Sequence, residues 1–333
     1  MSYPDLFKRA ALLWWRTRSL WPLGVLAALM GAGDYSAGNF NSGVNLPTNA
    51  GGTGDVSPEL LEQWGRNPAL LALVENPAPF LIGLAVVILL WTLIASLVGQ
   101  LAHGAMIRVA DVADQGYQAS IGDGLRVGAA RLLPMFLLNL LLALPVLIML
   151  VAFFVVIGAL VAQLVAAGAG AFETPESGLL AFGGLLFCLV PLVLGMIAVS
   201  LALSFFTRIA QRACVLEGRG AIASLRRAWR LVTRNFGNVL LNWIALLMLG
   251  AVFGIVATLP ALAIAIPAGL GFLRSGEVPW LALLALLLYG FVASVLVGGV
   301  LSSFNSALWT VLFRAFVARE AVGQQPTPAV GGL

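Results

Sequence analysis

Charged side chains are scarce in this chain, and their scarcity decides its class. Of 333 residues only 10% are Asp, Glu, Lys or Arg, whereas 61% are hydrophobic, and the mean hydropathy is +1.01. A typical soluble domain carries about 25% charged residues, because its surface is solvated by water. Most of the surface of this protein must therefore face a bilayer, and the composition predicts an integral membrane protein.

Histidine, lysine and cysteine, which carry much of protein chemistry, are nearly absent. His103 is the single histidine, which excludes a zinc site of the His-Glu-x-x-His type. Lys8 is the single lysine, and no Gly-x-x-x-x-Gly-Lys motif surrounds it, which excludes a P-loop. Cys188 lies in an apolar run and Cys214 in a basic loop, so no disulfide framework is expected. The sequence predicts a protein that is not an enzyme, with no catalytic or metal-binding residues and no cofactor.

One motif of an intramembrane enzyme is nevertheless present. Gly31-Ala32-Gly33-Asp34 fits the Gly-x-Gly-Asp pattern of intramembrane aspartyl proteases. That chemistry needs two facing carboxylates that share a proton, and no other Asp or Glu lies inside the apolar segments. We therefore interpret these residues as the start of a loop.

Five segments are apolar and long enough to cross a hydrocarbon core of about 30 Å. They are residues 80–101, 132–167, 179–206, 239–273 and 280–313. A sixth segment, 20–32, reaches only about 20 Å as a helix and needs neighbouring residues to complete a crossing. Internal prolines such as Pro145 mark expected kinks or breaks in the longer segments.

The placement of the cations predicts the side on which each loop lies. Of the 18 Lys and Arg residues, all but Arg66 and Arg274 precede residue 20, follow residue 313 or lie in the loops 102–131 and 207–238. By the positive-inside rule this crowded side is cytoplasmic. The N-terminus and the loop 102–131 share it only if 20–32 also crosses. The sequence thus predicts six spans, with both termini on the cytoplasmic side of a prokaryotic inner membrane.

The predicted organisation is one all-α transmembrane domain over residues 1–320, a polytopic six-span bundle with amphipathic interfacial helices in its cytoplasmic loops. Residues 34–79 are expected to form an extracytoplasmic loop with short helices that start at Pro58 and Pro68. Residues 321–333, which include Gln324-Gln325-Pro326, are expected to be a disordered cytoplasmic tail. A cleaved signal peptide is the alternative for the N-terminal segment, although Pro22 in its apolar core counts against it.

The loops 102–131 and 207–238 look related, and each is followed by an asparagine at the same depth of the next span. The matched pairs are Arg108 and Arg212, Gly116 and Gly220, Ser120 and Ser224, Arg126 and Arg230, and, after a one-residue slip, Arg131 and Arg234, and Asn139 and Asn242. This pattern predicts a parallel repeat of helix pairs. Asn139 and Asn242 are a candidate intramembrane polar pair, for bonds between helices or for a transport path.

Each loop also carries an amphipathic pattern. In the first, Ser120 and Asp123 are spaced as a capping box at a helix start. In the second, apolar residues recur at helical spacing, and arginines line another face. Such helices should lie in the headgroup layer, with arginines near lipid phosphates. The candidate residues that face lipids or a partner are Arg226, Arg227, Trp229, Arg230 and Arg234. The alternative is that the arginines only hold the loop inside.

Residues 212–237 read RACVLEGRGAIASLRRAWRLVTRNFG, and the chain begins with Trp14-Trp15, Trp21-Pro22-Leu23-Gly24 and a Gly-rich loop. This layout resembles a loose set of bacterial polytopic proteins similar to the membrane domain that precedes some glycerophosphodiester phosphodiesterases. The resemblance implies a multi-pass fold and carries no activity over to particular residues. The phosphodiesterase domain itself, with its metal-binding carboxylates and histidines, is absent from this sequence.

Two functions of different classes remain. The first is a non-enzymatic membrane protein that interacts with lipids, anionic lipids included, or with partner proteins or further copies of itself through its basic helices. The second is a transporter or permease subunit for an unidentified small molecule or lipid, because parallel repeats of helix pairs recur in transporters. Since the cations lie in membrane loops, the pI of about 9.6 does not indicate nucleic acid. A polar cavity at mid-depth would favour transport, whereas a solid interior would favour the interaction role.

Overall fold

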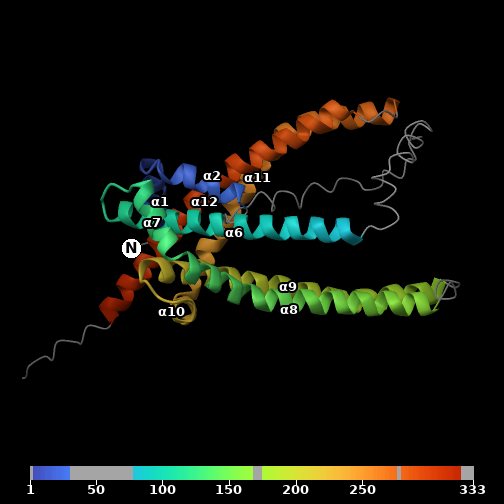
Figure 1. Ribbon diagram of the computed structural model, residues 1–333, viewed down its shortest axis with the longest axis horizontal. Helices are drawn as coiled ribbons and strands as arrows, with labels where there is room; N and C mark the ends of the chain where they lie inside the picture. Colours follow the sequence, from blue (N-terminus) through green and yellow to red (C-terminus); the bar gives the residue numbers. More distant parts are fainter. Residues whose placement is uncertain (1–2, 31–77, 168–174, 276–278, 324–333) are drawn as a thin grey trace, which may run out of the picture. The chain divides into compact units, whose positions relative to one another are not determined.

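The computed structural model describes residues 3–30, 78–167, 175–275 and 279–323, and in these ranges it contains helices and no strand (Figure 1). The predicted all-α class is therefore confirmed. The helices are α1 (Tyr3–Arg16), α2 (Leu20–Leu29), α6 (Ala78–Asp114), α7 (Ile121–Ala130), α8 (Leu132–Ala167), α9 (Pro175–Leu216), α10 (Ala221–Arg234), α11 (Phe236–Ser275) and α12 (Trp280–Gly323).

Five helices of the described ranges contain stretches long and apolar enough to cross a membrane. These stretches are Ala78–Asp114, Leu132–Ala159, Leu189–Leu216, Phe236–Phe272 and Trp280–Ala321. They correspond to the five long segments predicted from the sequence and indicate a multi-pass membrane protein. The predicted sixth span contains α2, whose 10 helical residues reach only about 15 Å. The Gly31–Asp34 motif and nearly all of the predicted extracytoplasmic loop lie outside the described residues.

The long helices extend further than a bilayer requires, and their surroundings change along their length. α6 has 37 residues and α12 has 44, lengths of about 55 Å and 66 Å. Residues 78–94 of α6 are exposed, whereas the helix is largely buried from Gly99 to Asp111. In α12, residues 301–313 are buried. Helix α6 therefore continues past its predicted span end with a stretch that packs inside the protein. Helix α12 continues to Gly323 and takes up the first residues of the expected tail.

The chain divides into two compact units. The first comprises Met1–Arg9, Ala129–Ile244 and Leu308–Leu333, and the second comprises Ala10–Gly128 and Ala245–Ala307.

Pro145, at which a kink or break was expected, lies within the continuous helix α8. The other prolines of the long segments, Pro191, Pro260 and Pro267, likewise lie inside α9 and α11, so none of the four interrupts its helix.

In the second unit, α2 packs directly against α6 and α12. Leu20, Leu23 and Ala27 of α2 share an apolar core with Ala105 and Met106 of α6. At the contact with α12 the backbones approach so closely that a Cβ on Gly24 would lie 2.3 Å from the carbonyl oxygen of Gly299. Without a hydrophobic drive between helices in lipid, small residues provide association through such close packing.

The turn between α6 and α7 is built from local hydrogen bonds. The amide of Gly116 donates to Ala113 (3.0 Å) and that of Tyr117 to Val112 (3.2 Å), the Schellman pattern that closes a helix. It needs the positive φ of 87° at Gly116, which glycine adopts without strain. The Oγ of Ser120 accepts a hydrogen bond from the amide of Gly122 (3.2 Å), so Ser120 caps the start of α7. The reciprocal bond of Asp123 that would complete the capping box stays a prediction.

In the first unit, α8 and α9 pack side by side along a long hairpin, and the short helix α10 packs against both (Figure 1). Nη1 of Arg131, at the start of α8, donates to the carbonyl of Gly218 in the loop between α9 and α10 (3.1 Å). Gly218 has a φ of 69°, so this turn also depends on a glycine. The contact brings the α7–α8 junction beside the loop that precedes α10.

Two glycines of α12 allow a matched test of the helix packing. A Cβ on Gly299 would lie 2.9 Å from Cα of Val25, whereas a Cβ on Gly290 would meet nothing within 4 Å. We expect Gly299→Ala to lower the thermal unfolding temperature of the detergent-purified protein, since overpacking costs about 1–3 kcal/mol. Gly290→Ala should leave it unchanged or raise it, because alanine favours helix. Equal effects would contradict the close α2–α12 contact.

Candidate functional site: the basic face of α10

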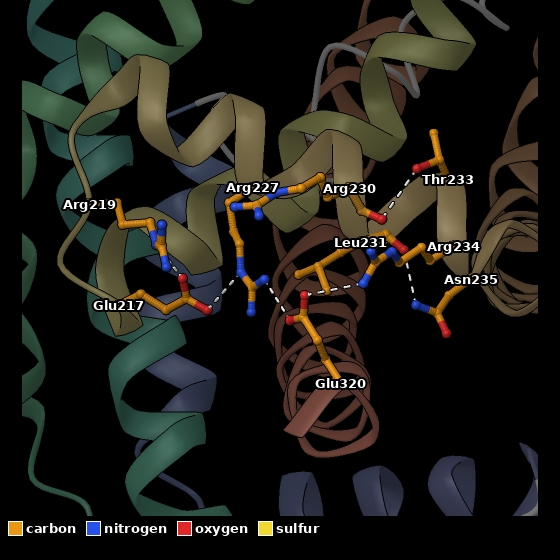
Figure 2. Close-up of polar contacts among 9 residues, drawn as sticks. All are labelled: Glu217, Arg219, Arg227, Arg230, Leu231, Thr233, Arg234, Asn235 and Glu320. Atoms are coloured by element: carbon orange, nitrogen blue, oxygen red, sulfur yellow. Dashed lines mark hydrogen bonds and ion pairs between the residues drawn. The ribbon is translucent and has the colours of Figure 1, made fainter. Parts of the chain in front are cut away.

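Three charged side chains of the first unit form what we call the clamp: Glu217, Arg227 and Glu320. Arg227 of α10 lies between the two carboxylates, with Nε 3.2 Å from Oε1 of Glu217 and Nη1 2.6 Å from Oε2 of Glu320 (Figure 2). The side chain of Arg227 is only 10% exposed, that of Glu217 19% and that of Glu320 14%. Charge-assisted contacts to both edges of a guanidinium fix its direction as well as its charge.

Two further arginines flank the clamp. Arg219 pairs with Glu217, and Nη1 of Arg234 lies 3.6 Å from Oε1 of Glu320 (Figure 2). Arg234 is 66% exposed, so water screens this second pair strongly. The clamp joins three elements, because Glu217 directly follows α9, Arg227 belongs to α10 and Glu320 belongs to the last turns of α12.

The clamp sets which face of α10 turns inward. Ser224, Arg227, Ala228, Leu231 and Val232 are the buried residues of this helix. They recur at steps of three and four, and therefore share one side of the helix. The opposite side, which we call the outward face, consists of Ile222, Arg226, Trp229, Arg230 and Arg234.

The outward face combines apolar and cationic side chains. Ile222 is 67% exposed and Trp229 60% exposed, and the ring of Trp229 stacks on Phe206 of α9 with centroids 5.1 Å apart. Neither Arg226 nor Arg230 forms an ion pair with another described residue. This arrangement can attract anions while the indole and isoleucine side chains meet an apolar phase.

The structure separates residues that the sequence analysis had grouped. Arg226, Trp229, Arg230 and Arg234 are exposed, whereas Arg227 is held inside by the clamp. The apolar residues that recur at helical spacing in this loop are divided as well, because Val232 is buried against the protein while Ile222 faces outward. The two glutamates of the clamp were not among the candidate residues. Their only signal in the sequence is that they are acidic residues close to strongly basic segments.

Within the candidate polar pair of the spans, Asn139 has a partner that the sequence did not indicate. Nε2 of Gln211 in α9 donates to Oδ1 of Asn139 in α8 (3.1 Å), and Asn242 of α11 is fully buried. α12 contributes a further row of buried polar side chains: Ser302, Ser303, Asn305, Ser306 and Thr310. In the second unit, Oγ of Ser303 accepts a hydrogen bond from Nε1 of Trp14 (2.9 Å). Among the described residues no group of three or more His, Cys, Asp or Glu side chains could hold a metal ion.

The clamp makes a prediction about stability. We expect Glu320→Gln to lower the free energy of unfolding by about 1–3 kcal/mol. That range lies between the loss of a fully buried partner and that of an exposed one, and thermal melts in detergent measure it. Arg234→Gln is the control, since it removes the exposed partner of the same carboxylate and should change stability by about 0–1 kcal/mol. A larger effect of Arg234→Gln would mean that Arg227 is not the main partner of Glu320.

Comparison with known proteins places this chain in a family without adding a function. The family model that matches residues 65–320 is described as a domain of unknown function, DUF7847. The match reaches Glu320, so it contains α10 and the whole clamp. No curated protein and no solved structure matches the chain, and no link to glycerophosphodiester phosphodiesterases is shown. Because the match covers most of its length, the chain belongs to the DUF7847 family.

Proposed function

We propose that this chain is a non-enzymatic, multi-pass protein of a prokaryotic cytoplasmic membrane that interacts with lipids or with partner proteins through basic helices on the cytoplasmic side. The outward face of α10 carries this proposal. Its cations are exposed, and the helix is fixed in direction by Arg227 between two carboxylates. A loop that served only to hold the topology would need neither a fixed helix nor an exposed tryptophan.

Contacts within each unit support the predicted sidedness. In the second unit, Oγ of Ser19 donates to the carbonyl of Ala119 (3.5 Å), which places the start of α2 beside the α6–α7 loop. In the first unit, the α7–α8 junction, the α9–α10 loop and the end of α12 meet around Arg131, Gly218 and Glu320. These are the segments that the charge count assigns to the cytoplasm.

The same contacts support six spans. The start of α2 and the end of α6 lie side by side, and if α6 crosses once this arrangement favours one further crossing before α6, as the charge count predicts. α2 supplies the beginning of that crossing, although its helix is shorter than the hydrocarbon core.

The order of elements supports the proposed parallel repeat, with a change in its register. A long helix, a short helix and a long helix follow one another in α6–α7–α8 and again in α9–α10–α11. α6 and α9 each end two residues before a glycine with positive φ, Gly116 and Gly218. Gly116 thus corresponds to Gly218, and Gly220, its predicted match, is instead the extended N-cap of α10. In this repeat α7 and α10 are the proposed interfacial helices.

A transporter or permease subunit is the second candidate, favoured by the buried polar row of α12. Two observations weigh against it. Asn139 is engaged by Gln211, as expected of a bond between helices. Ser303 of the row contacts Trp14, two residues before Arg16, so it lies near the basic end of its unit rather than at mid-depth. We therefore favour the interaction role.

Reporter fusions test the topology. Fusions after Gly54 and Ser177 should report the extracytoplasmic side, and fusions after Gly122, Gly220 and Val322 should report the cytoplasm, because arginines resist translocation. Paired reporters that are active on opposite sides give the measurement. An inside signal at Gly54 would contradict six spans, and an outside signal at Gly220 would remove the proposed function itself.

A double-mutant cycle decides what Asn139 does. We expect Asn139→Ala and Gln211→Ala to couple by about 0.6 kcal/mol, and at most about 1.7, in thermal stability, which is the range of hydrogen bonds between membrane helices. Replacing Ser204, which bonds to its own helix at Leu201, should show no coupling to Asn139 and serves as the control. A cycle without coupling between Asn139 and Gln211 would leave the asparagine available for a transport path.

A further inference from the structure

We propose that the outward face of α10 binds the anionic headgroups of the protein's own membrane, with Arg226 and Arg230 on lipid phosphates and Trp229 at the boundary of the acyl chains. This inference rests on the proposed function and names the partner of that same surface. It also assigns different roles to neighbouring arginines, because Arg227 belongs to the clamp and does not take part in binding.

The geometry of the helix presents the two chemistries together. Ile222 and Trp229 stand two turns apart on one line of the helix, and Arg226, Arg230 and Arg234 follow one another at steps of four on the adjacent line. An apolar edge thus runs beside a cationic edge along the same exposed side. A helix in the membrane interface has this pattern, since one edge enters the acyl boundary and the other meets phosphates.

The connections of α10 place it at the membrane surface. Only the loop 217–220 separates it from the span in α9, and only Asn235 separates it from α11. Trp229 stacks on Phe206 of α9, and the neighbouring Phe205 makes an edge contact with Trp243 of α11, with centroids 5.7 Å apart. Aromatic side chains from α9, α10 and α11 therefore gather at one level, as they do at membrane–water interfaces.

Exposed apolar surface continues from α10 into α11. Phe236, Leu241 and Ile244 of α11 are about half exposed, and they follow α10 directly in a helix apolar enough to cross the membrane. A surface that runs without interruption into a lipid-facing helix fits a bilayer.

The glutamates of the clamp leave two arginines of the outward face, Arg226 and Arg230, available to a ligand. Within the described part of the chain, Glu217 and Glu320 pair with Arg219, Arg227 and Arg234, whereas Arg226 and Arg230 pair with no carboxylate. Each cation close to an anionic leaflet strengthens binding by about fivefold. The loss of Arg226 and Arg230 together should therefore weaken lipid binding by about 25-fold.

The test uses the full chain in a mild detergent, titrated with phosphatidylglycerol or with phosphatidylcholine. The readout is the lipid concentration that half-saturates the rise in thermal unfolding temperature. We expect phosphatidylglycerol to act at lower concentration than phosphatidylcholine, and salt to reduce the difference. Arg226→Gln with Arg230→Gln should shift the phosphatidylglycerol midpoint by about 25-fold. The pair Arg226→Lys and Arg230→Lys should keep most of the affinity.

A matched control removes the same charge elsewhere. Lys8→Gln with Arg16→Gln replaces two cations that are exposed on α1, and it should leave the midpoint unchanged. An equal shift in this control would show that net charge, not α10, attracts the lipid, and would overturn the proposal. The proposal would also be overturned if the protein showed no preference for phosphatidylglycerol, or if the midpoint did not shift in the α10 double variant.

A second measurement does not depend on these variants. In bilayers with brominated acyl chains, the wild-type chain should lose more fluorescence than Trp229→Phe loses, because Trp229 lies at the acyl boundary. Equal quenching would place α10 away from the bilayer and would overturn the proposal.

If lipid binding fails while the reporter after Gly220 still reads inside, the interaction role survives with a protein partner. If that reporter reads outside, the proposed function falls as well.

Discussion

The absence of water from the bilayer core is the constraint on which the rest of this structure depends. Every backbone amide and carbonyl at that depth must find its partner within the protein. Five long helices meet this demand, and the described turns between α6 and α7 and between α9 and α10 are confined to their basic ends. At those turns the chain changes direction through single glycines with positive φ, Gly116 and Gly218.

The same constraint changes what holds the helices together. Lipid tails are as apolar as leucine, so burial of apolar side chains contributes little to association within the membrane. The contacts observed are instead close and specific. Gly24 and Gly299 bring two backbones together. Trp14 donates a hydrogen bond to Ser303, far away in the chain, and Gln211 donates one from α9 to the neighbouring helix α8. The hydroxyl of Tyr289 in α12 adds a bond to the carbonyl of Ala257 in α11 (2.7 Å).

The basic loop before α11 shows one residue type in two roles. Arg227 is inside the protein, where two carboxylates offset the loss of its hydration. Arg226, its neighbour in sequence, is exposed beside Trp229. Successive helix positions differ by about 100°, so adjacent arginines cannot both face the same surroundings. The internal arginine holds the helix in place, and the external ones are free to meet a partner.

The sequence alone determined the all-α class, the five long apolar helices, the cap at Ser120 and the presence of an exposed basic helix at α10, because periodicity and composition are local properties. It did not determine where the helices end, since α6 continues to Asp114 and α12 to Gly323, beyond the buried Asp111 and beyond Glu320 of the clamp. It also grouped Arg227 with the surface arginines and missed Glu217 and Gln211. Only the tertiary structure decided these points, because the burial of a charge depends on partners from distant elements, and Glu320 reaches Arg227 only once α12 has folded against α10.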